Sequence, residues 1–247
     1  MNRYKGIVAY DGSGYAGFQI QTNDKTIQGM LEHALKKMHK GTEIKVISSG
    51  RTDAGVHAHG QAFHFDSPLE LPSDRWVRAV NGLLPHDIAI QSVEKVEASF
   101  HARYDVTGKT YKYFLFTGKI RDPFNRNFTT YYPYRLNIEL MRAAAQYFVG
   151  THDFTSFCSA KTTKENKIRT ITALTIEQQN DNIIFTFTGN GFLYNMVRII
   201  VGTLLNVGNG KVKPTDIPAI MEACDRKRAS KTAPATGLYL WEVYYDN

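Results

Sequence analysis

RYKGIVAY, residues 3–10, alternates in a way that predicts a β-strand. The segment TIQGMLEHALKKM, residues 26–38, places apolar side chains at helical spacing and predicts an amphipathic helix. Those side chains are Ile27, Met30, Leu31, Ala34, Leu35 and Met38. The chain therefore begins with a strand that is followed by an amphipathic helix.

Four further segments extend this beginning into a longer pattern. EIKVISS (43–49) and HGQAFHFD (59–66) are both strand-like. SDRWVRAVNGLL (73–84) predicts a helix with Ser73 as its N-cap, and DIAIQSVEKV (87–96) predicts a closing strand. The element order of this first part is β-α-β-β-α-β.

The same order of elements starts again after residue 104. Strands are expected at 106–117, 168–179, 182–189 and 237–245, and helices at 137–149 and 191–207. We therefore predict an α+β protein of two ferredoxin-like, split β-α-β halves, residues 1–104 and 105–247. The two halves are expected to form a continuous antiparallel sheet with a central cleft.

The composition points to a folded protein with a polyanionic partner. The 247 residues carry a formal charge of +7, with a pI of about 9.3, and a basic chain favours polyanions. No apolar run approaches the roughly 18 residues of a membrane span, and the first residues lack a signal-peptide pattern. We expect a cytoplasmic protein with no membrane partner.

The spacing of the two cysteines bears on possible disulfide and metal sites. Cys158 and Cys224 have no CxxC or Cys/His spacing, which argues against a disulfide framework or a thiolate metal site. Both are expected to be buried, reduced thiols.

The loops at 118–136 and 158–167 carry several lysines and arginines, so they are candidate nucleic-acid contacts, although charged loops are often merely solvated.

The densest polar cluster is SSGRTDAGVHAHGQAFHFD, residues 48–66. Gly50 and Gly55 bracket Arg51, Thr52 and Asp53 between two strands, so a turn is expected to present Asp53 outward. Asp and Gly are common turn formers, and in isolation this pattern is more often structural than functional. The chain contains no P-loop, no GxGxxG and no Ser/His/Asp arrangement that would supply another chemistry.

The histidines of this cluster raise a metal hypothesis, because HxH on a strand places two imidazoles on one face. The offset from His59 to His64 is odd, so on a regular strand His64 and Asp66 face away from His57 and His59. A single site would need a bulge to collect all four. His64 and Asp66 alternate with Phe63 and Phe65. This alternation is more simply explained by a strand with one polar and one buried face.

GRTDAGVHAHGQAFHFD resembles the signature of the TruA-type tRNA pseudouridine synthases, and further blocks along nearly the whole chain are similar to that family. Phe18 stands where the family usually has Trp, which exchanges one buried aromatic for another. In chain order the further blocks are YDGSGYAGFQIQ with TIQGMLEHAL, VNGLLPHDIAI with FHARYDVTGKTYKY, HDFTSF, and FLYNMVRIIVGTLLNVGNG with TAPATGLYLWEVYY.

The resemblance implies roles for four residues. Asp53 matches the catalytic aspartate, which either adds covalently or removes a sugar proton to give a glycal; both routes stay open. Arg198 matches an arginine that pairs with this aspartate, and its apolar neighbours argue against a plain helix-surface position. Tyr111 matches the tyrosine that stacks on the target base, and without the family match it would be a core strand aromatic. Arg51 matches an arginine that fills the space of the flipped nucleotide.

The implied activity is isomerisation of uridine to pseudouridine in the tRNA anticodon arm, at positions 38, 39 and 40. The resemblance implies no cofactor, no metal and a homodimer, with tRNA bound in the central cleft. Two rivals are a non-catalytic RNA-binding protein or chaperone of the same fold, and a metal hydrolase built on the histidines. The first rival would be favoured by an altered Asp53 or Tyr111, and neither is altered.

Overall fold

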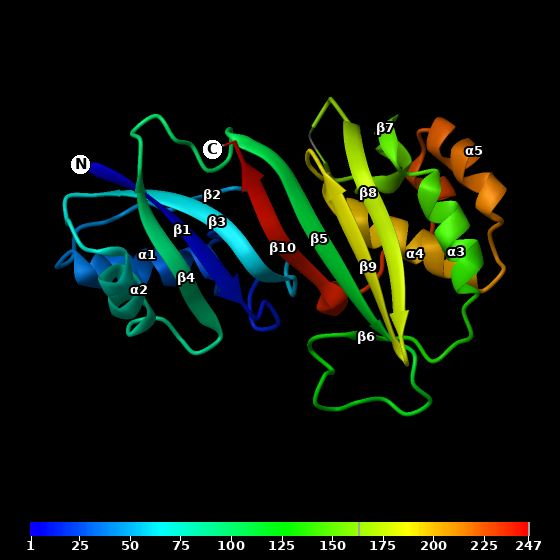
Figure 1. Cartoon of the computed structure of the whole chain (residues 1–247), viewed down its shortest axis with the longest axis horizontal. Helices are drawn as coiled ribbons and strands as arrows, with labels where there is room; N and C mark the ends of the chain where they lie inside the picture. The colour runs from blue at the N-terminus through cyan, green and yellow to red at the C-terminus, as the bar shows by residue number, and fades with distance from the viewer. Residues whose placement is uncertain (163, 247) are drawn as a thin grey trace. The chain divides into compact units, whose positions relative to one another are not determined.

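The computed structural model describes residues 1–162 and 164–246, which form two compact units. The first unit contains Met1–Thr107 together with Tyr239–Asn247, and the second contains Gly108–Leu238. The last strand of the chain thus groups with the first unit, although it was expected to end the second half. Each unit combines strands with helices, so the α+β class is confirmed (Figure 1).

The first unit is built as the β-α-β-β-α-β order predicts. Strand β1 lies between β4 and β3, antiparallel to both, and β2 pairs antiparallel with β3. Strand β10 adds to β3 in parallel through Tyr239 and Leu240. The bounds are β1 Asn2–Tyr10, α1 Ile27–Met38, β2 Ile47–Ser48, β3 His57–Ser67, α2 Ser73–Asn81, β4 Ile88–Val96 and β10 Leu238–Tyr245.

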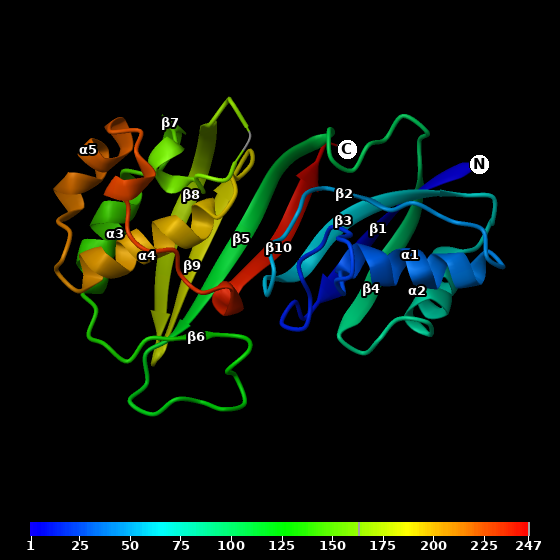
Figure 2. The same ribbon diagram turned by 180° about the vertical axis from the view of Figure 1, so that it is seen from behind.

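Helices α1 and α2 cover one face of this sheet (Figure 2). The core of the unit lies between the sheet and the buried faces of the two helices. Trp76 of α2 is fully buried, with its ring 5.1 Å from that of Tyr4 and 5.2 Å from that of Phe65. Phe18 is 1% exposed, which confirms the buried aromatic expected there. Burial of these large rings supplies the main hydrophobic stabilisation of the unit.

Two local predictions for the first unit are wrong. Pro72, not Ser73, is the N-cap of α2, and no side chain caps that end. The strand expected at 43–49 shortens to the two residues of β2. The reason is that Val46 bonds to α1 side chains, accepting from Gln28 and donating to Glu32, so its backbone is not available to a ladder.

The second unit has the strand order β5-β9-β8-β7, antiparallel throughout, with β6 parallel to β5. The expected hairpin of β8 and β9 is confirmed. The long helix begins at Met196 instead of residue 191, because Asn195 adopts a left-handed conformation (φ 61°). The bounds are β5 Val106–Phe116, β6 Thr130–Tyr131, α3 Ile138–Gln146, β7 Gly150–Asp153, β8 Ile168–Gln179, β9 Asn182–Gly189, α4 Met196–Gly208 and α5 Ile217–Glu222.

Other expectations have mixed outcomes. Cys158 is buried as predicted, whereas Cys224 is exposed. Strand β7 and helix α5 were not anticipated, since both are too short to show a clear periodicity. In the described part of the chain, no helix is long and apolar enough to cross a membrane. The continuous sheet, the central cleft and the division at residue 104 stay predictions.

Candidate active-site loop

The four predicted site residues are distributed over both units. Arg51 and Asp53 lie in the loop between β2 and β3 of the first unit. Tyr111 lies on β5 and Arg198 on α4, both in the second unit. Arg51 is exposed, and the other three are partly buried. Each environment is therefore described within its own unit.

The loop that carries Asp53 is held from behind by a chain of buried hydrogen bonds. The Gln61 side-chain amide donates to the Gly50 carbonyl (2.7 Å), and the Tyr10 hydroxyl donates to Gln61 Oε1 (2.5 Å). The Thr52 hydroxyl lies 2.7 Å from the Tyr10 hydroxyl. These contacts fix Gly50 and Thr52, the residues on either side of Arg51.

A second segment, residues 11–18, packs against the same loop. Phe18 donates its backbone N–H to the Thr52 carbonyl (3.1 Å), and Gly55 donates to the Tyr15 carbonyl (3.3 Å). A side chain at Gly17 would meet that Thr52 oxygen at 2.6 Å, and Gly17 also has a φ of 95°. Only glycine allows this approach without strain. The Val56 N–H donates a hydrogen bond to the Asp53 carbonyl (3.1 Å), and this bond closes the predicted turn.

The histidines of β3 share one face, contrary to the expectation for a regular strand. The register shifts between Val8, opposite Gln61, and Tyr10, opposite Ala58, so β3 contains a bulge. The bulge turns His57 and His59 to the face that also carries His64. The rings of His57 and His59 stack on Tyr239 and Trp241 at 4.6 and 4.3 Å. Among the residues described, no three His, Cys, Asp or Glu side chains form a group suited to a metal.

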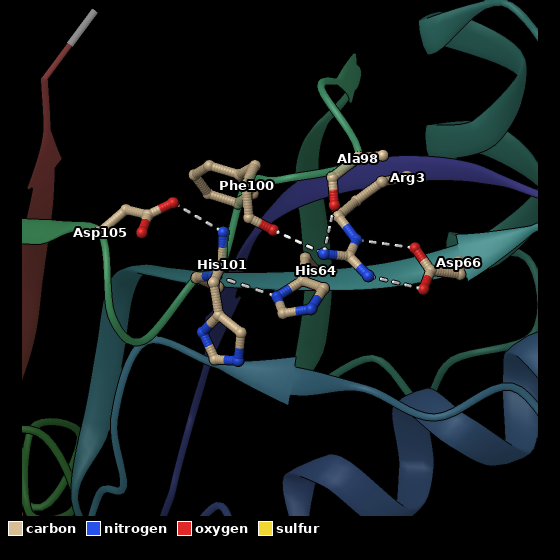
Figure 3. A network of polar contacts seen from close by, with 8 residues as sticks. Arg3, His64, Asp66, Ala98, Phe100, His101 and Asp105 are labelled. Carbon is tan, nitrogen blue, oxygen red and sulfur yellow. Dashed lines mark hydrogen bonds and ion pairs between the residues drawn. The ribbon is translucent and has the colours of Figure 1, made fainter.

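His64 is buried, so the face expected to be polar is covered at this point (Figure 3). Its Nδ1 accepts the N–H of Ala102 (3.1 Å), and the His101 ring meets it edge-on at 4.9 Å. Burial lowers the pKa of His64 to about 4, so the imidazole is neutral near pH 7. A neutral histidine accepting a backbone N–H is a structural group here.

Arg3 binds the backbone of the segment between β4 and β5, which also contains His101 and Ala102 (Figure 3). Its guanidinium makes a two-pronged pair with Asp66, at 2.8 Å for each bond, and donates to the carbonyls of Ala98 and Phe100. The hydrogen bonds from Arg3 hold the pKa of Asp66 below its usual value. Asp66 is therefore held in an ion pair with Arg3, and the bonds from Arg3 fix the segment between β4 and β5 to the sheet.

In the second unit, Arg198 is anchored at the start of α4. Its Nε donates to the Ala233 carbonyl (2.7 Å), one terminal nitrogen donates to Asn195 Oδ1 (2.9 Å), and Ala233 donates back to the Arg198 carbonyl (3.0 Å). The 231–233 segment approaches so closely that a Cβ on Gly202 would lie 2.0 Å from the Lys231 oxygen. These bonds orient the guanidinium, which supports a specific role over a solvated surface position.

Tyr111 is half-buried on β5, opposite Phe187 of β9, and its ring meets Phe192 edge-on at 5.1 Å. The next tyrosine on that face, Tyr113, is fully buried and donates to the Pro234 carbonyl (3.0 Å). Tyr113 is thus the core aromatic of this strand. Tyr111, in contrast, is only partly buried.

Sequence reasoning did not single out Tyr10 or Gln61, although both lie in blocks that resemble the family. Gln61 lies on the face of β3 that carries Phe63 and Phe65, and it is 0% exposed. A buried amide needs hydrogen-bond partners, so a glutamine on an apolar face of a strand is a usable signal. What it bonds to is visible only in the folded chain.

Comparison with known proteins shows the family of this chain. The family described as "tRNA pseudouridine synthase" matches residues 7–105 and 144–246. A "tRNA pseudouridine synthase A 1" from Bacillus cereus is 55% identical over 247 residues, covering 100% of both chains. The "tRNA pseudouridine synthase A" of Geobacillus kaustophilus is 50% identical over 99% of this chain and 95% of its own, and that of Listeria innocua 49% over 100% of both. Matches of this identity over the full chain confirm the resemblance seen in the motifs: the chain belongs to the tRNA pseudouridine synthase family.

Proposed function

We propose that this chain isomerises uridine to pseudouridine at positions 38, 39 and 40 of the tRNA anticodon arm, with Asp53 as the catalytic carboxylate. The observation that carries the proposal is the Asp53 loop, whose neighbours Gly50 and Thr52 are held by buried hydrogen bonds. A carboxylate that must meet a reacting sugar or base needs such a preorganised backbone. Family membership supplies the substrate class.

The reaction breaks the bond between N1 of the base and C1′ of the sugar, rotates the base and joins C1′ to C5. The proton on C5 leaves and one appears on N1, so atoms balance and no electrons are exchanged. Asp53 adds covalently to the sugar or base, or takes a sugar proton to give a glycal, and both routes place its carboxylate beside the target nucleotide. No cofactor or metal is needed for either.

Three further residues complete the proposal. Arg198 is assigned to keep the carboxylate ionised, for which its anchored guanidinium is suited. Tyr111 is assigned to the target base and its C5 proton, and its half-buried ring is compatible with stacking. Exposed Arg51 is assigned to the space that the flipped nucleotide leaves. These roles rest on the family resemblance, and the role of Tyr111 is tested by a variant described in the Discussion.

The direct test is chemical mapping of pseudouridine in tRNA from cells with and without this protein. We expect the modification at positions 38–40 to disappear without it and to return when the gene is restored. Purified protein and unmodified tRNA should form the same product in the presence of a chelator. An unchanged map in the deletion strain would reject the function, and loss of turnover in chelator would favour the metal hydrolase.

Binding to tRNA should depend on the 158–167 loop and on salt. None of Lys161, Lys164 and Lys167 forms an ion pair with a described residue, so their charges can face phosphates. Reversing all three to Glu changes the formal charge from +7 to +1. We expect weaker tRNA binding and a shallower salt dependence between about 50 and 200 mM, with an unchanged single-turnover rate at saturating enzyme.

A matched control reverses Lys37, Lys40 and Lys45, three exposed lysines of the first unit, with the same change in net charge. If the control weakens binding as much as the loop variant, the loop makes no specific contact. A salt-independent affinity of the wild type would contradict phosphate binding altogether.

We also propose that the protein is a homodimer in the cytoplasm. The segment 118–136 exposes large apolar side chains, with Ile120 83%, Phe124 87% and Tyr134 66% exposed. Such a patch is unfavourable in water unless a partner covers it. Light scattering at micromolar concentration should give the mass of two chains, and a monomeric mass with full activity would contradict the dimer.

A further inference from the structure

Three polar side chains are buried directly behind the Asp53 loop. Tyr10, at the end of β1, is 5% exposed, Thr52 in the loop is 6% exposed, and Gln61 on β3 is 0% exposed. Burying hydroxyl and amide groups costs free energy unless each is hydrogen-bonded. Their contacts with one another are therefore a condition for this local structure.

The hydrogen bonds have a defined direction. Gln61 Nε2 donates to the Gly50 carbonyl, which shows that Oε1 is the atom facing Tyr10. The Tyr10 proton is used in the bond to Oε1, so the Thr52 hydroxyl donates to the Tyr10 oxygen. These hydrogen bonds connect Thr52 to Tyr10, Tyr10 to Gln61, and Gln61 to Gly50, so Tyr10 joins the Thr52 hydroxyl to the Gln61 amide.

Tyr10 and Gln61 lie on the same covered face of the sheet, next to a bulge in β3. Val8 lies opposite Gln61, and Tyr10 lies two residues after Val8 on β1, so the side chains of Tyr10 and Gln61 point to the same face. Beyond the bulge, Tyr10 lies opposite Ala58, one residue nearer the start of β3 than a regular ladder would place it. The side chains of Tyr10 and Gln61 meet diagonally across the two strands.

We propose that Tyr10 is a positioning residue for the reaction, acting on Asp53 through the loop backbone. Thr52 is held at its hydroxyl by Tyr10 and at its carbonyl by Phe18, one residue before Asp53. Gly50 is held at its carbonyl by Gln61 and by Ser48 (2.8 Å). The loop is thus fixed on both sides of Arg51 and immediately before the carboxylate. This inference rests on the proposed function of Asp53.

The test variant is Tyr10→Phe in the full-length protein. It removes one oxygen and leaves Thr52 and Gln61 without their shared partner. The single-turnover rate of pseudouridine formation at saturating enzyme should fall at least about tenfold, because small displacements of a reacting group are costly, while tRNA affinity stays within about threefold. Amide hydrogen exchange of the peptide containing residues 50–55 should become faster.

Thr52 supplies a second, conservative pair of variants. Thr52→Val keeps the shape but lacks the hydroxyl, so it should slow the reaction as Tyr10→Phe does, whereas Thr52→Ser keeps the donor and should retain most of the rate. Combining Tyr10→Phe with Thr52→Val should slow the reaction little beyond either single change, because both break the same bond. Additive losses would mean that the two residues act separately.

Tyr4→Phe is the matched control. Tyr4 lies on the same strand, is 3% exposed, and donates its hydroxyl to the Leu69 carbonyl at 2.8 Å, away from the loop. It should lower thermal stability without slowing turnover or changing exchange at 50–55. If Tyr10→Phe matches Tyr4→Phe in both readouts, the positioning role is wrong. If the wild type forms no pseudouridine, the proposed function is wrong, and exchange still decides whether Tyr10 fixes the loop.

Discussion

Asp53→Asn should bring pseudouridine formation below about a hundredth of the wild-type rate, because an amide can neither add to the sugar or base nor remove the sugar proton. The substitution keeps the size of the side chain, and the turn is closed by the Asp53 backbone carbonyl, so the loop should keep its conformation. Affinity for tRNA should change by no more than a few-fold, since many phosphate contacts supply most of the binding. Product should be measured by chemical mapping, and affinity by titration.

Asp74→Asn provides the control for this change. Asp74 is an exposed carboxylate on α2 of the same unit, paired with Arg78 at 3.2 Å, and exposed pairs contribute little. Its loss should leave turnover and binding unchanged. Survival of more than about a hundredth of the rate in Asp53→Asn would remove Asp53 from its central role, and a second carboxylate would have to be sought.

Tyr111→Phe should bind tRNA normally and release little or no final product. The substitution keeps an aromatic face of the same size, so stacking on the base and the edge-on contact with Phe192 can persist. Only the hydroxyl is lost. Because the proton must leave C5 late in the reaction, a hydroxyl that moves it would be missed, and a species still protonated at C5 should accumulate.

Tritium release from C5-labelled tRNA under single-turnover conditions measures this step, alongside a binding titration. Tyr147→Phe is the control, since Tyr147 is an exposed tyrosine at the C-terminal end of α3 in the same unit. It should release tritium at the wild-type rate. Release by Tyr111→Phe near that rate would leave Tyr111 as a stacking platform without an acid-base role.

The local features of this protein were predictable from periodicity. Helix α1 begins at Ile27, one residue after Thr26, whose side chain accepts the N–H of Gly29. The alternation of β1 and β3 and the hairpin of β8 and β9 were predicted for the same reason: neighbouring residues determine which face of an element is apolar. The turn at Asp53 follows from its glycines.

Only the tertiary structure decided which side chains hold the Asp53 loop from behind. Tyr10 and Gln61 are 51 residues apart, and their hydrogen bond exists because β1 pairs with β3. The bulge in β3 places His57, His59 and His64 on one face, where a regular strand would separate them. His64 becomes buried only when the segment around Ala102 folds over it. Bulges and burial depend on contacts between segments distant in the chain, and local periodicity contains no information on these contacts.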